Sequence, residues 1–236
     1  MTPSLAGAGQ ARLLLIALCL TAFLDGLDIS IVNVALPQIQ QQLGFSTDLL
    51  GWVISAYAIT YSGFVLLGGR TADQFGRRRM FLLALGLFCF ANLLGGLAHT
   101  PAQLLVARFL MGLAAAFNGP AALSLLTTLF LEGPARTRAL GVFSSMAASG
   151  FTAGLILGGL LSSLEWRLIF LLPAGVALLA LIVSWLVDLC AFMLNHLLDE
   201  RDRSSTKDNH HANETEPTKE HAGIKGQNEG MRPPPL

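Results

Sequence analysis

Long runs of apolar residues, separated by short polar segments, fill the first 187 residues of the chain. A helix that crosses a bilayer needs about 20 consecutive apolar residues. The pattern therefore predicts six membrane-spanning helices, at residues 13–36, 49–68, 80–98, 102–130, 139–161 and 168–187. The first run continues to Pro37, well past the length of a signal peptide, so we interpret it as a retained span.

Composition supports the same class. Hydrophobic residues make up 53% of the chain and charged residues only 13%, whereas soluble proteins carry about 25% charged residues. The net charge is zero, which gives no indication of nucleic-acid binding. Three scattered cysteines suit neither a disulfide framework nor a zinc site. We expect an all-α membrane protein, a six-transmembrane-helix bundle in a lipid bilayer, with no metal and no cofactor.

Arginine is distributed unevenly among the connecting segments. We predict an arginine-rich loop at 69–79, a second basic loop at 132–138, and a loop without Lys or Arg at 37–48. A cytoplasmic N-terminus places seven arginines inside (12, 70, 77, 78, 79, 136 and 138) and only Arg167 outside. Because short cytoplasmic loops are enriched in Lys and Arg, we predict a multi-pass protein of the cell's inner membrane with both termini in the cytoplasm.

The composition changes after Val187. Residues 188–198 mix apolar and polar positions and are a possible extension of the sixth helix. Residues 199–236 are polar and charged and lack the apolar content needed to build a core, so we predict a disordered cytoplasmic tail.

Three ionisable residues lie deep in predicted spans: Asp25, Asp28 and Arg108. Each costs about 3 kcal/mol to insert, so each is a candidate functional residue. Asp25 and Asp28 are three residues apart and share a helix face. One interpretation is a carboxyl group that exchanges protons. The other is a structural pair of one aspartate with Arg108 that holds two helices together.

Small and aromatic residues also recur at helical spacing. Gly150, Gly154 and Gly158, with Gly159 following, form the small-xxx-small pattern of close helix packing. Gly112 and Ala116 repeat it in the fourth span. Three further residues are candidates for lining a substrate cavity: Asn33, Trp52 and Tyr57. For the two aromatic residues, packing or placement at the membrane interface is the commoner role.

The arginine-rich segment contains Gly69, Asp73, Gly76, Arg77 and Arg78. It serves at least as a topology anchor. Asp73 is placed to pair with a nearby arginine or to cap the next helix. The spacing of its glycines with Asp73 and Arg77 suggests a role beyond charge.

Together these motifs resemble the N-terminal half of a major facilitator superfamily transporter, and most closely the fourteen-span drug:proton antiporters. The resemblance covers about residues 11–187. It is carried by the sequence 27–37 (LDISIVNVALP) in the first span, Gly-x-x-x-Asp-x-x-Gly-Arg-Arg at 69–78, Arg108 with Gly112, the glycines from 150 to 159, and Trp166-Arg167-x-x-Phe170.

The resemblance implies roles for these residues. Asp28, Arg108 and Asp25 would take part in proton coupling. Gly69, Asp73, Gly76, Arg77 and Arg78 would form a cytoplasmic gate, and the fifth-span glycines a close contact linked to antiport. The implied function is proton-coupled efflux of drugs or other small molecules by alternating access.

Two features depart from the family pattern. Leu155 stands where the fifth-span motif has proline, which removes an expected kink. The chain also shows only six spans, so we expect a truncated half-transporter that forms a homodimer or pairs with a separate C-terminal half. The alternative is a non-transporting membrane scaffold. An enzyme is disfavoured, since no Gly-x-Ser-x-Gly, His-Glu-x-x-His or nucleotide-binding motif occurs.

Overall fold

The computed structural model describes residues 5–130 and 132–186, with side chains from residue 13 onward. The chain divides after Asp188 into two units, and all described residues belong to the first, Met1–Asp188. The predicted extension at 188–198 and the predicted tail at 199–236 therefore lie outside the described residues.

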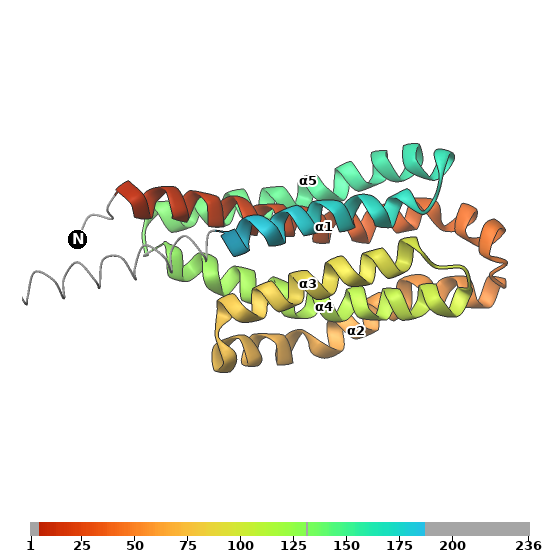
Figure 1. Ribbon diagram of the computed structural model, residues 1–236, viewed down its shortest axis with the longest axis horizontal. Coiled ribbons are helices and arrows are strands. Elements are labelled where there is room, and N and C mark those ends of the chain that lie inside the picture. The colour runs from red at the N-terminus through yellow and green to blue at the C-terminus, as the bar shows by residue number, and fades with distance from the viewer. Residues whose placement is uncertain (1–4, 131, 187–236) are drawn as a thin grey trace, which may run out of the picture. The chain divides into compact units, whose positions relative to one another are not determined.

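The described chain is helical and contains no strand. Six of its helices are long and apolar enough to cross a membrane, as the sequence predicts. They are α1 (Leu5–Leu43), α2 (Thr47–Phe75), α3 (Arg77–Gly96), α4 (Pro101–Leu129), α5 (Pro134–Leu164) and a sixth helix, Leu168–Leu186 (Figure 1).

Local sequence signals set the helix ends. Ser46 caps α2 by accepting a hydrogen bond from the Leu49 amide, and Thr100 caps α4 by accepting one from the Gln103 amide. α4 and α5 begin with proline at the first turn, where its missing N–H costs nothing. Gly76 separates α2 from α3 with φ of 98°, a conformation that glycine adopts without strain.

The connections are shorter than the sequence analysis predicted, and three predicted loops are wrong in extent. α1 continues through Pro37 to Leu43, so the loop at 37–48 reduces to residues 44–46. The segment 69–79 is helical except at Gly76, and the basic residues of 132–138 lie mostly in the first turns of α5. A helix of 29 residues is about 43 Å long, more than the ~30 Å hydrocarbon core, so polar helix ends extend beyond the apolar runs that guided the prediction.

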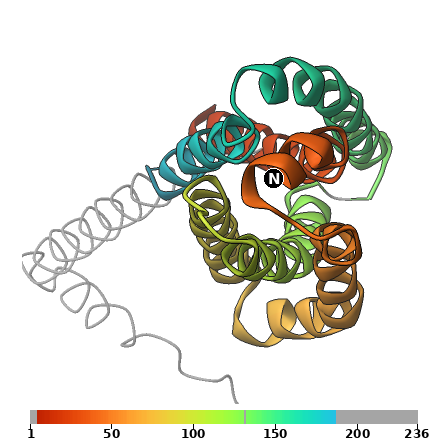
Figure 2. The ribbon, with the colours of Figure 1, turned by 90° about the vertical axis from the view of Figure 1, so that its right-hand side faces the viewer.

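The helices contact one another to very different extents. α1 packs along α5, and α4 packs along both α2 and α3. The sixth helix contacts α3, where the Cys89 thiol lies 3.4 Å from the Ala174 carbonyl. Figure 2 shows α1 and α4 between the outer helices, with α2 and α5 at one side. About two thirds of the apolar window of α1 is buried (67%), against 17% for α2 and 11% for α5. Much of α2 and α5 is therefore left uncovered by the bundle.

Two clusters of buried apolar residues form the core. One lies toward the end opposite the arginines and includes Ile31, Met111, Trp166 and Phe170. The other lies toward the arginine-rich end and includes Phe81, Phe88 and Leu126. The buried polar groups described next lie in the middle of the bundle, where α1, α2 and α4 meet.

Candidate functional site

Arg108 and Asp28 form a buried ion pair between α4 and α1. Arg108 Nη1 donates to Asp28 Oδ2 at 2.8 Å, and the two side chains are 2% and 0% exposed. Arg108 Nε donates to the Val53 carbonyl of α2 at 3.0 Å. One guanidinium therefore joins three helices, and this pairing is the structural alternative that the sequence analysis left open for Asp28.

Tyr57 completes the surroundings of the guanidinium. The Arg108 guanidinium carbon lies 4.6 Å from the centroid of the Tyr57 ring, within cation–π range. Tyr57 also stacks on Tyr61, with ring centroids 6.2 Å apart. Tyr57 is buried and Tyr61 is 39% exposed. The predicted cavity residue Tyr57 thus packs against the ion pair, and Tyr61 extends the aromatic pair toward the surface of the bundle.

Asp25 lies beside this ion pair with a different partner. Its Oδ2 accepts a hydrogen bond from Asn118 Nδ2 of α4 at 3.1 Å. Asp25 Oδ1 and Asn118 Oδ1 are both buried, and neither has a hydrogen-bond partner in the part of the chain that the structure describes. Asp25 and Asp28 thus share a helix face but differ in chemistry, since one carboxyl group meets a cation and the other a neutral amide.

The fifth-span glycines allow α5 to approach α1. A methyl group on Gly150 would meet the Phe23 backbone, one on Gly154 the Leu27 carbonyl and Ser30 hydroxyl, and one on Gly158 the Ile31 backbone. A methyl group on Gly159 would meet nothing within 4 Å. Three of the four predicted packing glycines therefore form the contact, and Gly159 points elsewhere.

A second close contact joins α2 and α4. A methyl group on Gly112 would meet the Tyr57 backbone, and one on Gly68 would meet the Ala116 carbonyl. This contact holds Tyr57 and Val53 against Arg108, so the small residues of the fourth span position the ion pair.

The predicted gate residues lie at the arginine-rich end, around the break between α2 and α3. Arg77 Nη2 lies 3.3 Å from Asp73 Oδ1, with the two side chains 39% and 64% exposed. Asp73 thus pairs with an arginine and does not cap α3, which has no side-chain cap. Gly69 lies in the last turns of α2, and Arg78 lies in the first turn of α3. An exposed pair spaced four residues apart contributes only about 0.3–0.5 kcal/mol.

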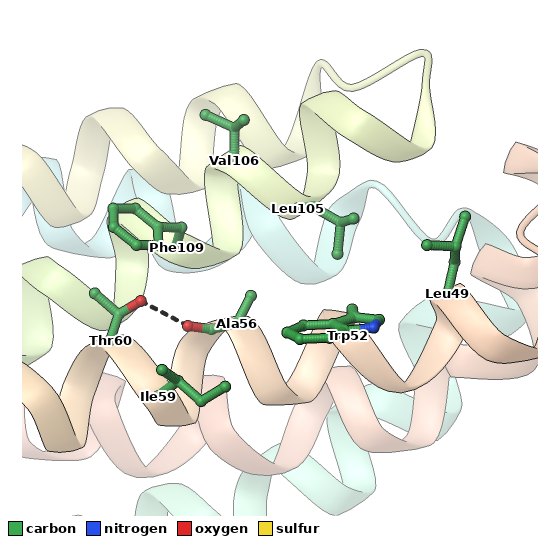
Figure 3. A pocket seen from close by; sticks show the side chains of 8 residues that line it. All are labelled: Leu49, Trp52, Ala56, Ile59, Thr60, Leu105, Val106 and Phe109. Carbon is green, nitrogen blue, oxygen red and sulfur yellow. Dashed lines mark hydrogen bonds between the residues drawn. The ribbon is translucent and has the colours of Figure 1, made fainter.

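Trp52, the other aromatic cavity candidate, lines an apolar groove of about 530 Å³ between α2 and α4 (Figure 3). The groove is formed by Leu49, Trp52, Ala56, Ile59, Thr60, Leu105, Val106 and Phe109. The Thr60 hydroxyl donates to the Ala56 carbonyl at 2.7 Å, which removes its donor from the groove. Asn33 lies on an exposed face of α1, where its amide donates to the Ile29 carbonyl at 2.6 Å.

Sequence reasoning missed several members of this site. Asn118 was not predicted as a site residue; it lies in α4, which is continuous through Pro120. Gly26 and Gly68 were also missed, because the partner of each is on another helix. A polar residue at mid-span, as at Asn118, is the signal that could have been used.

Comparison with known proteins identifies the family. The sequence model described as Major Facilitator Superfamily matches residues 18–226, whereas we found the resemblance over about residues 11–187. The chain belongs to the Major Facilitator Superfamily.

Relatives of this Major Facilitator Superfamily chain include proteins named for antibiotic export or resistance. The chain is 46% identical over 169 residues to the puromycin resistance protein pur8 of Streptomyces alboniger, which covers 71% of the chain and 33% of that protein. It is 42% identical over 170 residues to the cephamycin export protein CmcT of Amycolatopsis lactamdurans, covering 71% and 35%. The multidrug resistance protein Stp of Mycobacterium tuberculosis (strain CDC 1551 / Oshkosh) is 38% identical over 181 residues, covering 75% and 34%. The chain thus spans about a third of the length of these relatives.

Solved structures of the superfamily share the fold. The proton:xylose symporter XylE matches with a TM-score of 0.64 at 16% identity, covering 76% of this chain and 45% of that one. A bacterial homologue of the lysosomal transporter Spinster, in an inward-facing conformation, matches with a TM-score of 0.65 at 22% identity, covering 75% and 43%. The six-helix bundle is therefore the fold of part of a membrane transporter.

Proposed function

We propose that this chain forms one bundle of a proton-coupled exporter of antibiotics or other small molecules that works by alternating access. The observation that carries the proposal is the buried cluster of Asp25, Asp28 and Arg108 in the middle of a superfamily bundle. Charges are rarely kept in a membrane without a function. A carboxyl group there supplies a site for a proton between the two sides of the bilayer. The names of the relatives support export of antibiotics.

A substrate pathway requires a second bundle opposite this one. The uncovered faces of α2 and α5 supply a surface for it, and a second copy of this chain or a separate C-terminal half would fill the role. Transporters of this kind bind substrate at the interface between two repeats. We place Asn33, Trp52 and Tyr57 among the residues that face or support that interface. The two close glycine contacts, between α1 and α5 and between α2 and α4, keep this bundle rigid while it moves.

The gate at Gly69, Asp73, Gly76, Arg77 and Arg78 fits the same mechanism. A tenfold preference for one conformation takes about 1.4 kcal/mol, more than the exposed Asp73–Arg77 pair contributes by itself. The gate therefore acts through additional contacts between these residues and the second bundle. We infer that the arginine-rich end faces the cytoplasm, in line with the positive-inside rule.

Transport of puromycin into proteoliposomes under an imposed proton gradient tests the proposal. The full chain is reconstituted alone and together with the part of the pur8 protein that it does not span. We expect gradient-dependent puromycin uptake that is lost in D25N and R108M but retained in D48N, a control at the exposed start of α2. The proposal is contradicted if puromycin uptake is absent in both preparations or does not depend on the proton gradient.

A further inference from the structure

The charges of the buried cluster do not balance unless one carboxyl group holds a proton. Asp25 and Asp28 bring two carboxyl groups to one face of α1, three residues apart, and Arg108 brings a single cation. Residues three apart on a helix have Cβ atoms only about 5–6 Å from each other. Two carboxylates this close in a site of low polarity disfavour each other's ionised form. With one proton the cluster is neutral, and without it a net negative charge is buried.

The contacts decide which carboxyl group holds this proton. Asp28 is fully covered and lies 2.8 Å from the guanidinium of Arg108, so its ionised form has a counter-ion in direct contact. Asp28 Oδ1 lacks a hydrogen-bond partner among the described residues, but the carboxylate as a whole is neutralised by Arg108. Asp25 has no cation within ion-pair distance in the described part of the chain, and its hydrogen-bond partner there is the neutral amide of Asn118.

The Asp25–Asn118 pair has the geometry of a carboxyl–amide pair that lacks one hydrogen. The amide nitrogen already donates to Asp25 Oδ2, which leaves one acceptor oxygen on each side chain buried and without a donor. Two buried acceptors that lack a donor are costly. A single proton on Asp25 Oδ1, donated to Asn118 Oδ1, supplies the missing donor for both oxygens at once, because a protonated carboxyl group is a donor as well as an acceptor.

From this geometry we propose that Asp25 is the carboxyl group that carries the exchanged proton, held as a neutral acid against Asn118, while Asp28 stays ionised against Arg108 as a fixed structural charge. The inference rests on the proposed proton coupling and specifies its site. It differs from the roles that the resemblance implies, in which Asp28, Arg108 and Asp25 all take part in proton coupling. Asn118 acts as a positioning residue, since it holds the protonated form.

The surroundings of Asp25 permit exchange. Its residue surface is partly exposed, although Oδ1 itself is buried, whereas Asp28 is fully covered. The other ionisable groups near it are Asp28 on α1 and Tyr57 and Tyr61 on α2, while Arg108 on α4 lies against Asp28 and Tyr57. On the α5 side, Gly26 packs against the backbone of Ala147 and Phe151. In the exchange step the O–H bond of the Asp25 carboxyl group breaks, the proton leaves to water, and the carboxylate is reprotonated from the other side after the bundle has moved.

Infrared difference spectroscopy on the full chain in lipid nanodiscs tests the proposal, because a protonated carboxyl group has its own carbonyl band. We expect one such band at neutral pH that fades reversibly as the pH is raised. D25N removes the band and is expected to fold, because the asparagine keeps the shape of the protonated acid and donates to Asn118 Oδ1. D48N, which alters an exposed carboxylate at the start of α2, leaves the band unchanged. N118L moves the band to higher frequency, since hydrogen bonding lowers a carbonyl stretch, and this shift distinguishes Asp25 from Asp28 without a variant at Asp28.

The outcomes separate this inference from the proposed function. A missing band, a band that survives D25N, a band that N118L does not move, or a band that does not fade in the folded protein overturns the assignment to Asp25, whether or not puromycin is transported. Absence of proton-driven uptake in proteoliposomes counts against the exporter and leaves the band assignment as it stands.

Discussion

The buried ion pair gives the sharpest quantitative prediction. Removing one member leaves the other charge uncompensated inside the bundle, and for buried pairs this costs about 3–5 kcal/mol. In D28N, Arg108 keeps its hydrogen bond to the Val53 carbonyl and its contact with the Tyr57 ring. These remaining partners place the expected loss near the lower end, about 3 kcal/mol. In R108M, Asp28 keeps no cation among the described residues, so we expect a loss nearer the upper end, about 5 kcal/mol.

The double variant D28L/R108M separates the cost of an unpaired charge from the value of the pair. Replacing a buried pair by apolar residues of similar size is often neutral or stabilising. We therefore expect the double variant to be more stable than either single variant, with strong non-additivity between the two positions. Unfolding free energies measured in mixed micelles by a reversible denaturant titration provide the test. Single variants within about 0.5 kcal/mol of the unaltered chain, or a double variant that loses the sum of both, would refute this account of the pair.

Three further predictions concern packing and the surface. G154L should destabilise the bundle by about 1–3 kcal/mol, because its side chain would clash with the backbone of α1. The control G159L should change stability little. Equal effects of the two variants in thermal unfolding would contradict the assigned contact. G112L should separate α2 from α4 and weaken the Val53–Arg108 hydrogen bond, while G119L, which meets open space, should not; crosslinking yields between cysteines placed on α2 and α4 report the separation. D73N should cost no more than about 0.5 kcal/mol in the isolated chain, since its pair with Arg77 is exposed, and a loss of 2 kcal/mol would show that Asp73 has another role within this bundle.

The sequence predicts the spans of this fold well, because their signal is local. An apolar run long enough to cross a bilayer indicates a membrane helix, whatever the rest of the sequence is. All six predicted spans overlap the six candidate membrane helices. The helix ends were predicted less well. Residues 37–43 and 69–75 are polar enough to resemble loops, but they continue helices that extend beyond the apolar window. The helices are interrupted there at residues 44–46 and at Gly76.

The sequence predicted which residues form the buried site better than it predicted which of them contact each other. Asp25, Asp28 and Arg108 stand out because ionisable residues are rare inside spans. Which aspartate meets the arginine depends on the register of α1 against α4, which is seen only in the packed bundle. Gly68 therefore could not be assigned from its own position, and Asn118 offered only the signal of a polar residue at mid-span, since the partners of both are known only from the packed bundle.

Topology is the central claim, and cysteine accessibility in whole cells tests it most directly. In a background with Cys19, Cys89 and Cys190 replaced by alanine, single cysteines at Arg79 and Thr100 lie at opposite ends of the bundle. We predict that a membrane-impermeant maleimide added outside labels position 100 and reaches position 79 only after the membrane is opened. Labelling of position 79 in intact cells, or a chain recovered without membrane association, would contradict the account.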